Sequence, residues 1–231
     1  VINLAGEPIA DKRWTDTQKK IICDSRWDIT SELVSKINSC DTPPSVFLSG
    51  SAIGYYGNQG DKLVTEETPP HNEFTHELCA KWETIAQSVD QAKTRVVTLR
   101  TGVVLTEKGG ALEKMALPFK LGAGGTLGSG SQYLAWIHLQ DMVRAISFLL
   151  ENSACSGAFN LTAPEPVTNK EFSKALAKSL NRPCLFNVPG FVMKVAMGES
   201  STMILEGQRV IPQKLTTAGF SFDFPSIDEA L

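Results

Sequence analysis

The chain has 231 residues, of which 42% are apolar and 20% are charged, and a formal net charge of −3, values typical of a globular protein with one domain or a domain and a subdomain. It contains no long run of Lys and Arg and no apolar stretch of the roughly 18–20 residues that span a bilayer, so we expect neither a nucleic-acid partner nor a membrane partner. Five scattered cysteines without a CxxC pair, and no signal-peptide pattern, predict reduced thiols and a cytoplasmic location.

The first hundred residues alternate between strand and helix patterns. Apolar runs predict buried strands at 1–4, 45–49 and 95–100, and helical spacing of apolar residues predicts helices at 15–38 and 73–91. Thr15 is the candidate N-cap of the first helix, and a Gly- and Tyr-rich turn is expected at 50–60. This alternation predicts an α/β fold in which helices flank a parallel sheet.

The pattern changes near residue 105. Residues 106–133 are rich in glycine and predict loops. The later predicted elements are a helix at 138–151, a strand at 157–161, helices at 168–180 and 189–198, and an amphipathic segment at 204–217. We therefore expect a sheet domain over 1–105 and a smaller mixed subdomain over 106–231, partly threaded back onto the sheet.

Several segments in fixed order carry a family resemblance. They are VINLAG (1–6), SGSAIGYYG (49–57), LRTGVVL (99–105), WIHLQDM (136–142) and GAFNLTAP (157–164), and together they resemble the extended short-chain dehydrogenase/reductases. One atypical branch, the YfcH-type epimerase family proteins, is similar in the segments NLAGEPI (3–9), RWT (13–15), SR (25–26), GSGSQYLAWIH (128–138) and EGQRVIPQKLTTAGF (206–220). The tail, about 183–231, resembles a C-terminal domain of unknown function found in that branch.

The resemblance implies a Rossmann fold that binds NADP(H), with NAD(H) as the alternative. In this family a strand, a GxxGxxG turn and a helix precede the NLAG strand, and the turn lets the backbone approach the cofactor pyrophosphate. The chain opens on strand-like residues without an initiator Met, so we expect that this N-terminal βαβ portion is absent from it.

The candidate cofactor residues lie mostly where the predicted strands end. They are Leu4, Ala5, Gly6, Arg26, Ser49, Gly50, Arg100, Gly102 and Val104. Structural alternatives stay open for several of them. Gly6 could serve the dihedrals of a tight turn, Arg26 could be a solvated helix residue, and Arg100 could form a buried ion pair.

The catalytic Tyr-x-x-x-Lys pair of typical family members is missing. In that pair the Tyr transfers a proton, and the Lys one helical turn later lowers the Tyr pKa. Alignment on Glu83 puts Thr75 and Cys79 at these two positions, and Lys81 is rotated about 200° around the helix. The remaining candidate catalytic residues are Ser51, Tyr55 and Tyr56, each with a structural alternative in turn formation or packing.

Three further expectations concern the rest of the chain. Asp141 is expected to be structural, at the first turn of its helix. The glycine loop at 122–130, with Gln132, Tyr133 and Trp136, is the expected floor of a substrate pocket. The three histidines share no ligand spacing, so we assign no metal.

Two functions remain open at this point. The resemblance implies an NADP(H)-dependent nucleoside-diphosphate-sugar epimerase or oxidoreductase, monomeric or homodimeric, acting on an unidentified small molecule. The missing Tyr and Lys favour the alternative, a non-catalytic or regulatory dinucleotide-binding protein.

Overall fold

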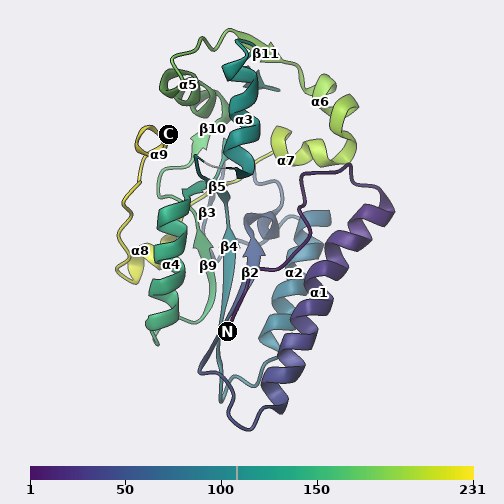
Figure 1. The fold of residues 1–231 in the computed structure, drawn as a ribbon, viewed down its shortest axis with the longest axis vertical. Coiled ribbons are helices and arrows are strands. Elements are labelled where there is room, and N and C mark those ends of the chain that lie inside the picture. The colour runs from purple at the N-terminus through teal and green to yellow at the C-terminus, as the bar shows by residue number, and fades with distance from the viewer. Residues whose placement is uncertain (108) are drawn as a thin grey trace.

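A four-stranded parallel sheet forms the centre of the molecule. The computed structural model describes residues 1–107 and 109–231 (Figure 1). The strand order is β1-β2-β4-β9, from β1 (Ile2–Asn3), β2 (Val46–Ala52), β4 (Arg95–Thr101) and β9 (Gly157–Leu161). All neighbours pair in parallel, which confirms the predicted Rossmann-type sheet.

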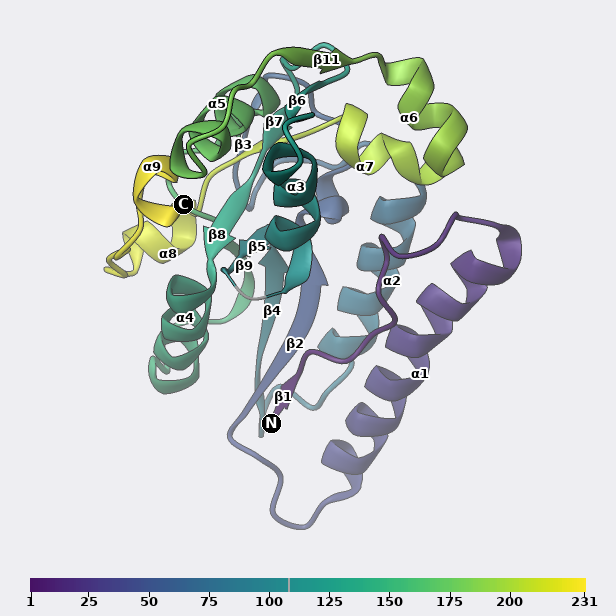
Figure 2. The ribbon, with the colours of Figure 1, turned by 45° about the horizontal axis from the view of Figure 1, so that its top comes forward.

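Helices cover both faces of this sheet. On one face α1 (Asp16–Ser39) and α2 (Phe74–Gln87) pack over Phe47 of β2, and on the other α4 (Leu139–Glu151) packs over Leu48. Both side chains are fully buried, because successive residues of a strand point to opposite faces. Figures 1 and 2 show α1 and α2 on one side of the strands and α4 on the other. The Thr15 hydroxyl accepts from Gln18 N at the start of α1, which confirms the predicted N-cap.

The remaining elements are short and form a lobe and its connections to the sheet. They are η1 (Ile53–Tyr56), β3 (Leu63–Val64), β5 (Val103–Leu105), α3 (Gly110–Lys120), β6 (Gly125–Leu127), β7 (Tyr133–Leu134), β8 (Trp136–His138), β10 (Val167–Thr168), α5 (Asn169–Ser179), β11 (Phe186–Val188), α6 (Gly190–Met197), η2 (Gly198–Ser201), α7 (Thr202–Leu205), β12 (Arg209–Val210), α8 (Gln213–Thr217) and α9 (Ile227–Ala230). Two-stranded ladders join β5 to β8, β6 to β11, β7 to β10 and β3 to β12. We call α3, β6, β7, β10, α5, β11, α6, η2 and α7 the lobe (Figure 2), and a second core around Trp136 and Phe172 holds it together.

Asp141 holds the C-terminal tail against α4. Its carboxylate is fully buried and accepts the backbone N–H groups of Asp223 and Phe224, both at 2.9 Å, and an N–H of Arg144 at 2.7 Å. The expected structural role is therefore present, although its partners lie in the tail rather than only at the helix start.

Four local expectations were wrong. The glycine-rich stretch contains α3, whose buried Leu112, Ala116 and Phe119 keep helical spacing between flanking glycines. The amphipathic segment at 204–217 is broken at Gly207, where a Cβ would clash with the Tyr133 carbonyl oxygen, and at Pro212.

The expected turn at 50–60 is partly strand, since β2 continues to Ala52 before η1 begins. The strand at 1–4 forms, but it lies at the sheet edge and only Asn3 is buried.

Candidate functional site

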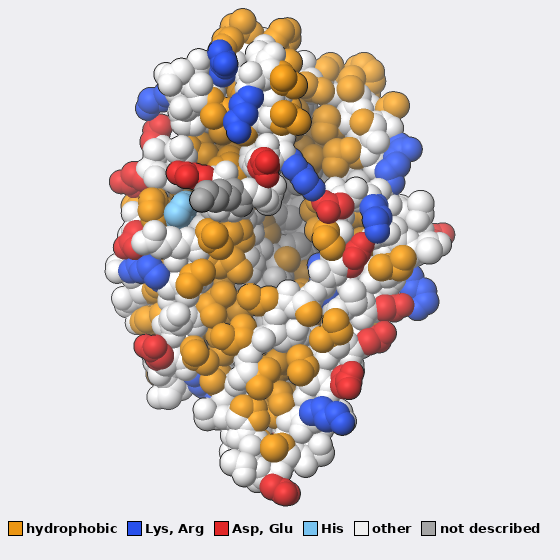
Figure 3. Space-filling model, viewed as in Figure 1, with side chains coloured by type: hydrophobic (Ala, Val, Ile, Leu, Met, Phe, Trp, Pro, Cys, Tyr) orange, Lys and Arg blue, Asp and Glu red, His pale blue; other side chains and the backbone are white. Residues whose placement is uncertain are grey.

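The carboxyl ends of three parallel strands meet at one edge of the main sheet. β1 is in register with β2 through Asn3 and Ser49, and β2 with β4 through Ser51 and Arg100. The lobe containing α3, α6 and α7 lies beyond this edge (Figure 2), and the surface is hollowed between the lobe and α1 (Figure 3). Because ligands of open α/β sheets bind outside the carboxyl ends of the strands, this cleft is the candidate site.

The end of β1 is open to the cleft side. Leu4 and Gly6 are exposed and Ala5 is half-buried. A Cβ on Gly6 would lie 2.8 Å from Cζ of Arg26, whereas the Gly6 φ is not in the left-handed region. The Arg26 guanidinium, and not a turn dihedral, thus occupies the space beside Gly6, and a side chain at this position would displace it.

Arg26 is a half-buried cation without an acidic partner. Its Nη1 donates to the carbonyl oxygens of Glu7 and Ile22, both at 3.0 Å. Among the described residues, Nε and Nη2 have no hydrogen-bond acceptor and no carboxylate lies within ion-pair distance. Burial lowers the pKa of Arg26 below its ordinary value, yet a guanidinium stays charged at neutral pH. Such a group is suited to a phosphate oxygen.

Packing explains the residue types at four other predicted cofactor positions. The fully buried Ser49 hydroxyl donates to the Gly50 carbonyl oxygen at 3.3 Å, and a Cβ on Gly50 would lie 2.8 Å from the Trp82 ring. A Cβ on Gly102 would lie 2.7 Å from the Ala135 carbonyl oxygen, and Val104 pairs with Ile137 of β8. Cofactor contacts at these positions stay predictions.

Arg100 is the centre of a buried polar network. Its Nε and Nη2 donate to the two carboxylate oxygens of Glu83, each at 2.9 Å, and its Nη1 donates to Tyr56 Oη at 3.0 Å and to the Glu66 carbonyl oxygen at 3.2 Å. Arg100 is only 5% exposed, and hydrogen bonds to Glu83 raise its pKa despite burial. The guanidinium thus forms the buried ion pair that was the structural alternative for Arg100, and a side-chain contact with a cofactor is not supported. A backbone contact stays a prediction.

Tyr56 belongs to the same network and not to the cleft surface. It is fully buried, and its hydroxyl donates to Asn160 Oδ1 at 2.6 Å. Burial raises the pKa of Tyr56 to about 12, so the phenol is neutral at physiological pH. These contacts favour the packing alternative over proton transfer.

Ser51 lies between the Glu83–Arg100 ion pair and the positions at which the family's catalytic Tyr and Lys are replaced. Its hydroxyl donates to Glu83 Oε1 at 2.6 Å, and the residue is 6% exposed. Cys79 lies next to it at the predicted Lys position, and burial raises the pKa of its thiol to about 12. Thr75, at the predicted Tyr position, donates to Glu73 Oε1 at 2.6 Å. Neither Thr75 nor Cys79 supplies an ionisable group near neutral pH.

Tyr55 is the least buried of the three candidate catalytic residues. Its ring lies 3.5 Å from Cζ of Arg100, and its carbonyl oxygen is 2.7 Å from Nδ1 of His76. It lines a pocket of about 420 Å³ together with Glu83, Thr84 and Gln87. A catalytic role for Tyr55 stays a prediction.

The expected substrate-pocket floor stays a prediction for the glycine loop at 122–130, Gln132 and Tyr133. Trp136 is fully buried and donates to the Glu165 carbonyl oxygen, so its assignment to the pocket was wrong. Gln132 donates to the carbonyl oxygens of Leu127 and Ile204 and thus braces the glycine loop against α7. In the part of the chain that the structure describes, no group of His, Cys, Asp and Glu side chains forms a metal site.

Sequence reasoning missed Glu66 and Asn160 as network members. The Glu66 carboxylate accepts from Asn160 N at 3.0 Å and from Lys214 N at 3.2 Å, and it links the loop after β3 to β9 and α8. For Asn160 the sequence did offer a signal, since it is a polar residue inside the apolar strand run GAFNL. A buried polar side chain needs a hydrogen-bond partner, so this position predicts a buried polar contact.

The branch-specific RWT segment joins α1 to the lobe. Arg13 donates to the Val195 carbonyl oxygen of α6, Trp14 donates to the Ile9 carbonyl oxygen, and Thr15 caps α1. Ion pairs from Lys19 to Glu199 and from Lys114 to Asp11 add to this connection. The segment that leaves β1 is therefore fastened to the far side of the cleft.

Comparisons with known proteins agree with this geometry. The NAD dependent epimerase/dehydratase family matches residues 1–162, and a domain of unknown function, DUF1731, matches residues 188–231. The epimerase family protein Mb2239 of Mycobacterium bovis is 42% identical, across 100% of this chain and 76% of that protein. The epimerase family protein YfhF of Bacillus subtilis is 40% identical, across 100% of this chain and 76% of that protein.

A solved structure is similar over nearly the whole chain. The human epimerase family protein SDR39U1 (isoform 2), crystallised with NADPH, superposes with a TM-score of 0.95 and 35% identity, covering 99% of this chain and 79% of that one. A family match over more than half of the chain and these full-length similarities settle its membership. The chain belongs to the NAD dependent epimerase/dehydratase family, in the branch of epimerase family proteins that carry DUF1731 at the C-terminus.

Proposed function

We propose that this protein binds NADP(H), in preference to NAD(H), in the cleft at the carboxyl edge of the sheet, and acts as an epimerase or oxidoreductase on an unidentified small molecule. The observation that carries the proposal is the unpaired guanidinium of Arg26 beside the end of β1. Among the described residues this cation has only neutral partners, which are the oxygen acceptors of Nη1 and the Trp82 ring centred 5.4 Å from Cζ, so an anionic ligand would add a charge-assisted contact.

The residues at this strand end fit a dinucleotide. Gly6 has no side chain to cover Arg26, and Leu4 and Ala5 are not buried under the lobe. Arg26 would donate to a cofactor phosphate through Nε and Nη2, while Nη1 stays on the Glu7 and Ile22 carbonyl oxygens. The human relative, which is similar over almost the whole chain, was crystallised with NADPH, and this supports the choice of cofactor.

The chemistry that the bound cofactor supplies is hydride transfer at its nicotinamide. In this chain the Glu83–Arg100 pair fixes Ser51 and the Tyr55 ring at the strand ends. Ser51 would orient a substrate hydroxyl or carbonyl, and the Tyr55 hydroxyl or a water would move the proton, since Thr75 and Cys79 supply no acid or base.

A regulatory role without turnover is the second candidate. Its support is specific: Thr75 donates to Glu73, and Cys79 is a buried neutral thiol at the position of the catalytic Lys. Single-turnover measurements with bound NADPH and carbonyl compounds, and with bound NADP⁺ and hydroxyl compounds, separate the two, because only the first candidate changes the oxidation state of the cofactor in either direction.

Calorimetric titration of the full-length protein with NADPH and NADH tests the binding proposal. We expect tighter binding of NADPH, and a loss of about 10- to 100-fold in Arg26→Met, the range for a hydrogen bond to a charged group. Lys20→Met on the same helix is the matched control, because Lys20 is exposed and pairs with Asp24. Absence of heat with both nucleotides, or equal affinities of wild type and Arg26→Met, overturns the proposal.

A further inference from the structure

The outer end of the lobe exposes a cluster of large apolar side chains. Leu121 follows α3, Leu185 and Phe186 lie at β11, and Phe191 and Val195 lie on α6, with exposed fractions between 54% and 78%. The upper end of Figure 3 shows apolar side chains gathered over these elements. Single exposed apolar residues are ordinary, whereas a cluster of this kind marks an interaction surface. We call these five residues the lobe face.

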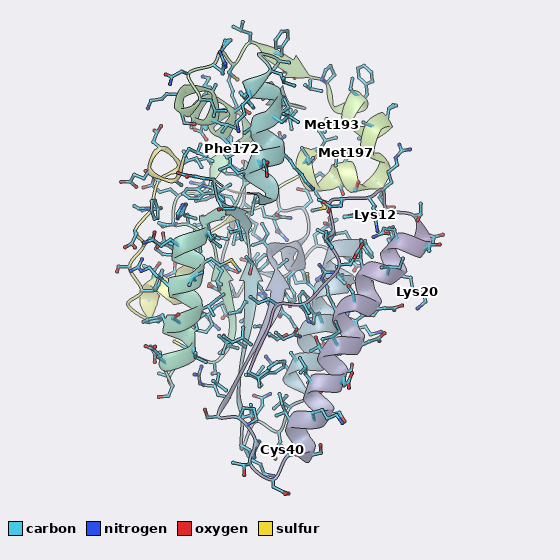
Figure 4. The ribbon with its side chains drawn as sticks, in the orientation of Figure 1. Lys12, Lys20, Cys40, Phe172, Met193 and Met197 are labelled. Carbon is cyan, nitrogen blue, oxygen red and sulfur yellow. The ribbon has the colours of Figure 1, made fainter. Side chains whose placement is uncertain are left out.

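The helix α6 is the most unusual part of the lobe face. Its sequence GFVMKVAM is almost entirely apolar, yet none of its eight residues is buried. By contrast, α4 buries Ala145 and Leu149 along one stripe. Met193 and Met197, labelled in Figure 4, lie on the same helix. A helix that is apolar all round normally lies inside a protein or against an apolar phase.

Charge is distributed unequally between the lobe and the rest of the chain. The lobe elements from α3 to β7 and from β10 to α7, residues 110–134 and 167–205, carry seven cations and three acids; the acids are Glu113, Glu171 and Glu199. The other 167 residues hold 15 of the 22 cations and 22 of the 25 acids. Lys114 and Lys178 are paired with carboxylates, whereas the described residues place none within 4 Å of the other five lobe cations. The lobe is therefore basic in an acidic protein.

Contrary to the sequence expectation of no membrane partner, we propose that the lobe face docks peripherally on an anionic lipid bilayer. Exposed apolar side chains flanked by Lys and Arg match an interface in which apolar groups enter the acyl boundary and cations bind lipid phosphates. The acidic remainder of the chain is repelled by the same surface, so the charge distribution orients the lobe toward the membrane. No helix among the described residues is long and apolar enough to cross a bilayer, so the contact is at the surface.

Charge also argues against a second copy of this chain as the occupant. A symmetric contact through the lobe face would bring two basic surfaces together, and like charges across an interface oppose association. Nucleic acid would use the cations but leave the apolar side chains of α6 without a partner.

Vesicle flotation tests the proposal. The protein should float with vesicles of equal parts phosphatidylcholine and phosphatidylglycerol and not with phosphatidylcholine alone. The variant Phe191→Gln with Val195→Gln should abolish flotation. Lys120→Gln with Lys194→Gln should lower the partition coefficient about 25-fold, the product of about fivefold per cation. Added salt should weaken binding of the wild type.

Matched controls distinguish binding through the lobe face from non-specific binding through other exposed apolar or cationic residues. Val143→Gln on α4, another exposed valine, and Lys36→Gln with Lys62→Gln, two cations outside the lobe, should float as the wild type does. Circular dichroism of each variant confirms folding. Equal flotation of the Phe191/Val195 variant and the Val143 variant overturns the proposal. So does wild-type flotation with neutral vesicles only, or a dimer in sedimentation equilibrium that is abolished by Val195→Gln.

Discussion

Removing the carboxylate of Glu83 should destabilise the protein strongly. The Arg100 and Glu83 side chains are 6% and 11% exposed, and two parallel hydrogen bonds of 2.9 Å join them. Glu83→Ala leaves a buried guanidinium whose remaining acceptors, Tyr56 Oη and the Glu66 carbonyl oxygen, are both neutral. It also deprives the Ser51 hydroxyl of its acceptor.

The cost follows from the burial of both partners. Breaking a buried ion pair from one side costs about 3–5 kcal/mol, because the remaining charge has lost both water and its counter-ion. Each kcal/mol lowers the melting temperature of a chain of this size by about 2–4 °C, so we expect a drop on the order of 10 °C. Urea unfolding followed by tryptophan fluorescence and by circular dichroism measures the free energy directly.

Two further variants make the test specific. Glu77→Ala removes an exposed carboxylate from the same helix and should change stability by less than about 0.5 kcal/mol. Glu83→Leu combined with Arg100→Met removes both charges and should recover much of the loss, since no buried charge remains. A loss below about 1 kcal/mol in Glu83→Ala would refute the assignment of this pair as a desolvated ion pair.

Three other outcomes are expected. Thr75→Ala and Cys79→Ala should leave any NADPH turnover nearly unchanged in rate assays, and a hundredfold drop, about 2.7 kcal/mol of barrier, would contradict the alignment of α2. Stability should fall as the pH rises from about 9 to 12, because the unfolded state releases the Cys79 and Tyr56 protons near their ordinary pKa values while the folded state holds both pKa values at about 12. Cys79→Ala and Tyr56→Phe should each reduce the fall in the free energy of unfolding between pH 9 and 12, measured by urea titration at each pH. If neither variant reduced this fall, neither group would be desolvated. Arg13→Gln should speed hydrogen exchange in α6 about two- to fivefold, the range for a surface contact, whereas Lys12→Gln should not.

The sequence determined the architecture because hydrophobic periodicity is local. The β-branched run at 95–100 and the helical spacing at 15–38 each specify an element without reference to the rest of the chain. Their alternation then fixes a parallel sheet and places the strand ends at one edge. The family resemblance, and the positions of Thr75 and Cys79, were likewise readable from ordered motifs.

Local periodicity was insufficient where contacts between residues distant in sequence decided the structure. The helix α3 lies between glycines that by themselves indicate loop, and it forms because Leu112, Ala116 and Phe119 find a core built from α5 and β8. The segment at 204–217 is broken because Gly207 lies against the Tyr133 backbone, a contact between residues distant in sequence.

Tertiary structure alone decided the roles of the polar residues. From the sequence, Arg26 and Arg100 were both candidate cofactor ligands, and nothing in their local context distinguished them. The fold places the Glu83 carboxylate 2.9 Å from Arg100 and leaves Arg26 without any among the described residues. Charge pairing depends on which side chains the packing brings within a few ångströms. The sequence therefore predicted where the candidate site lies, and only the packed structure showed which of its two cations has no carboxylate partner among the described residues.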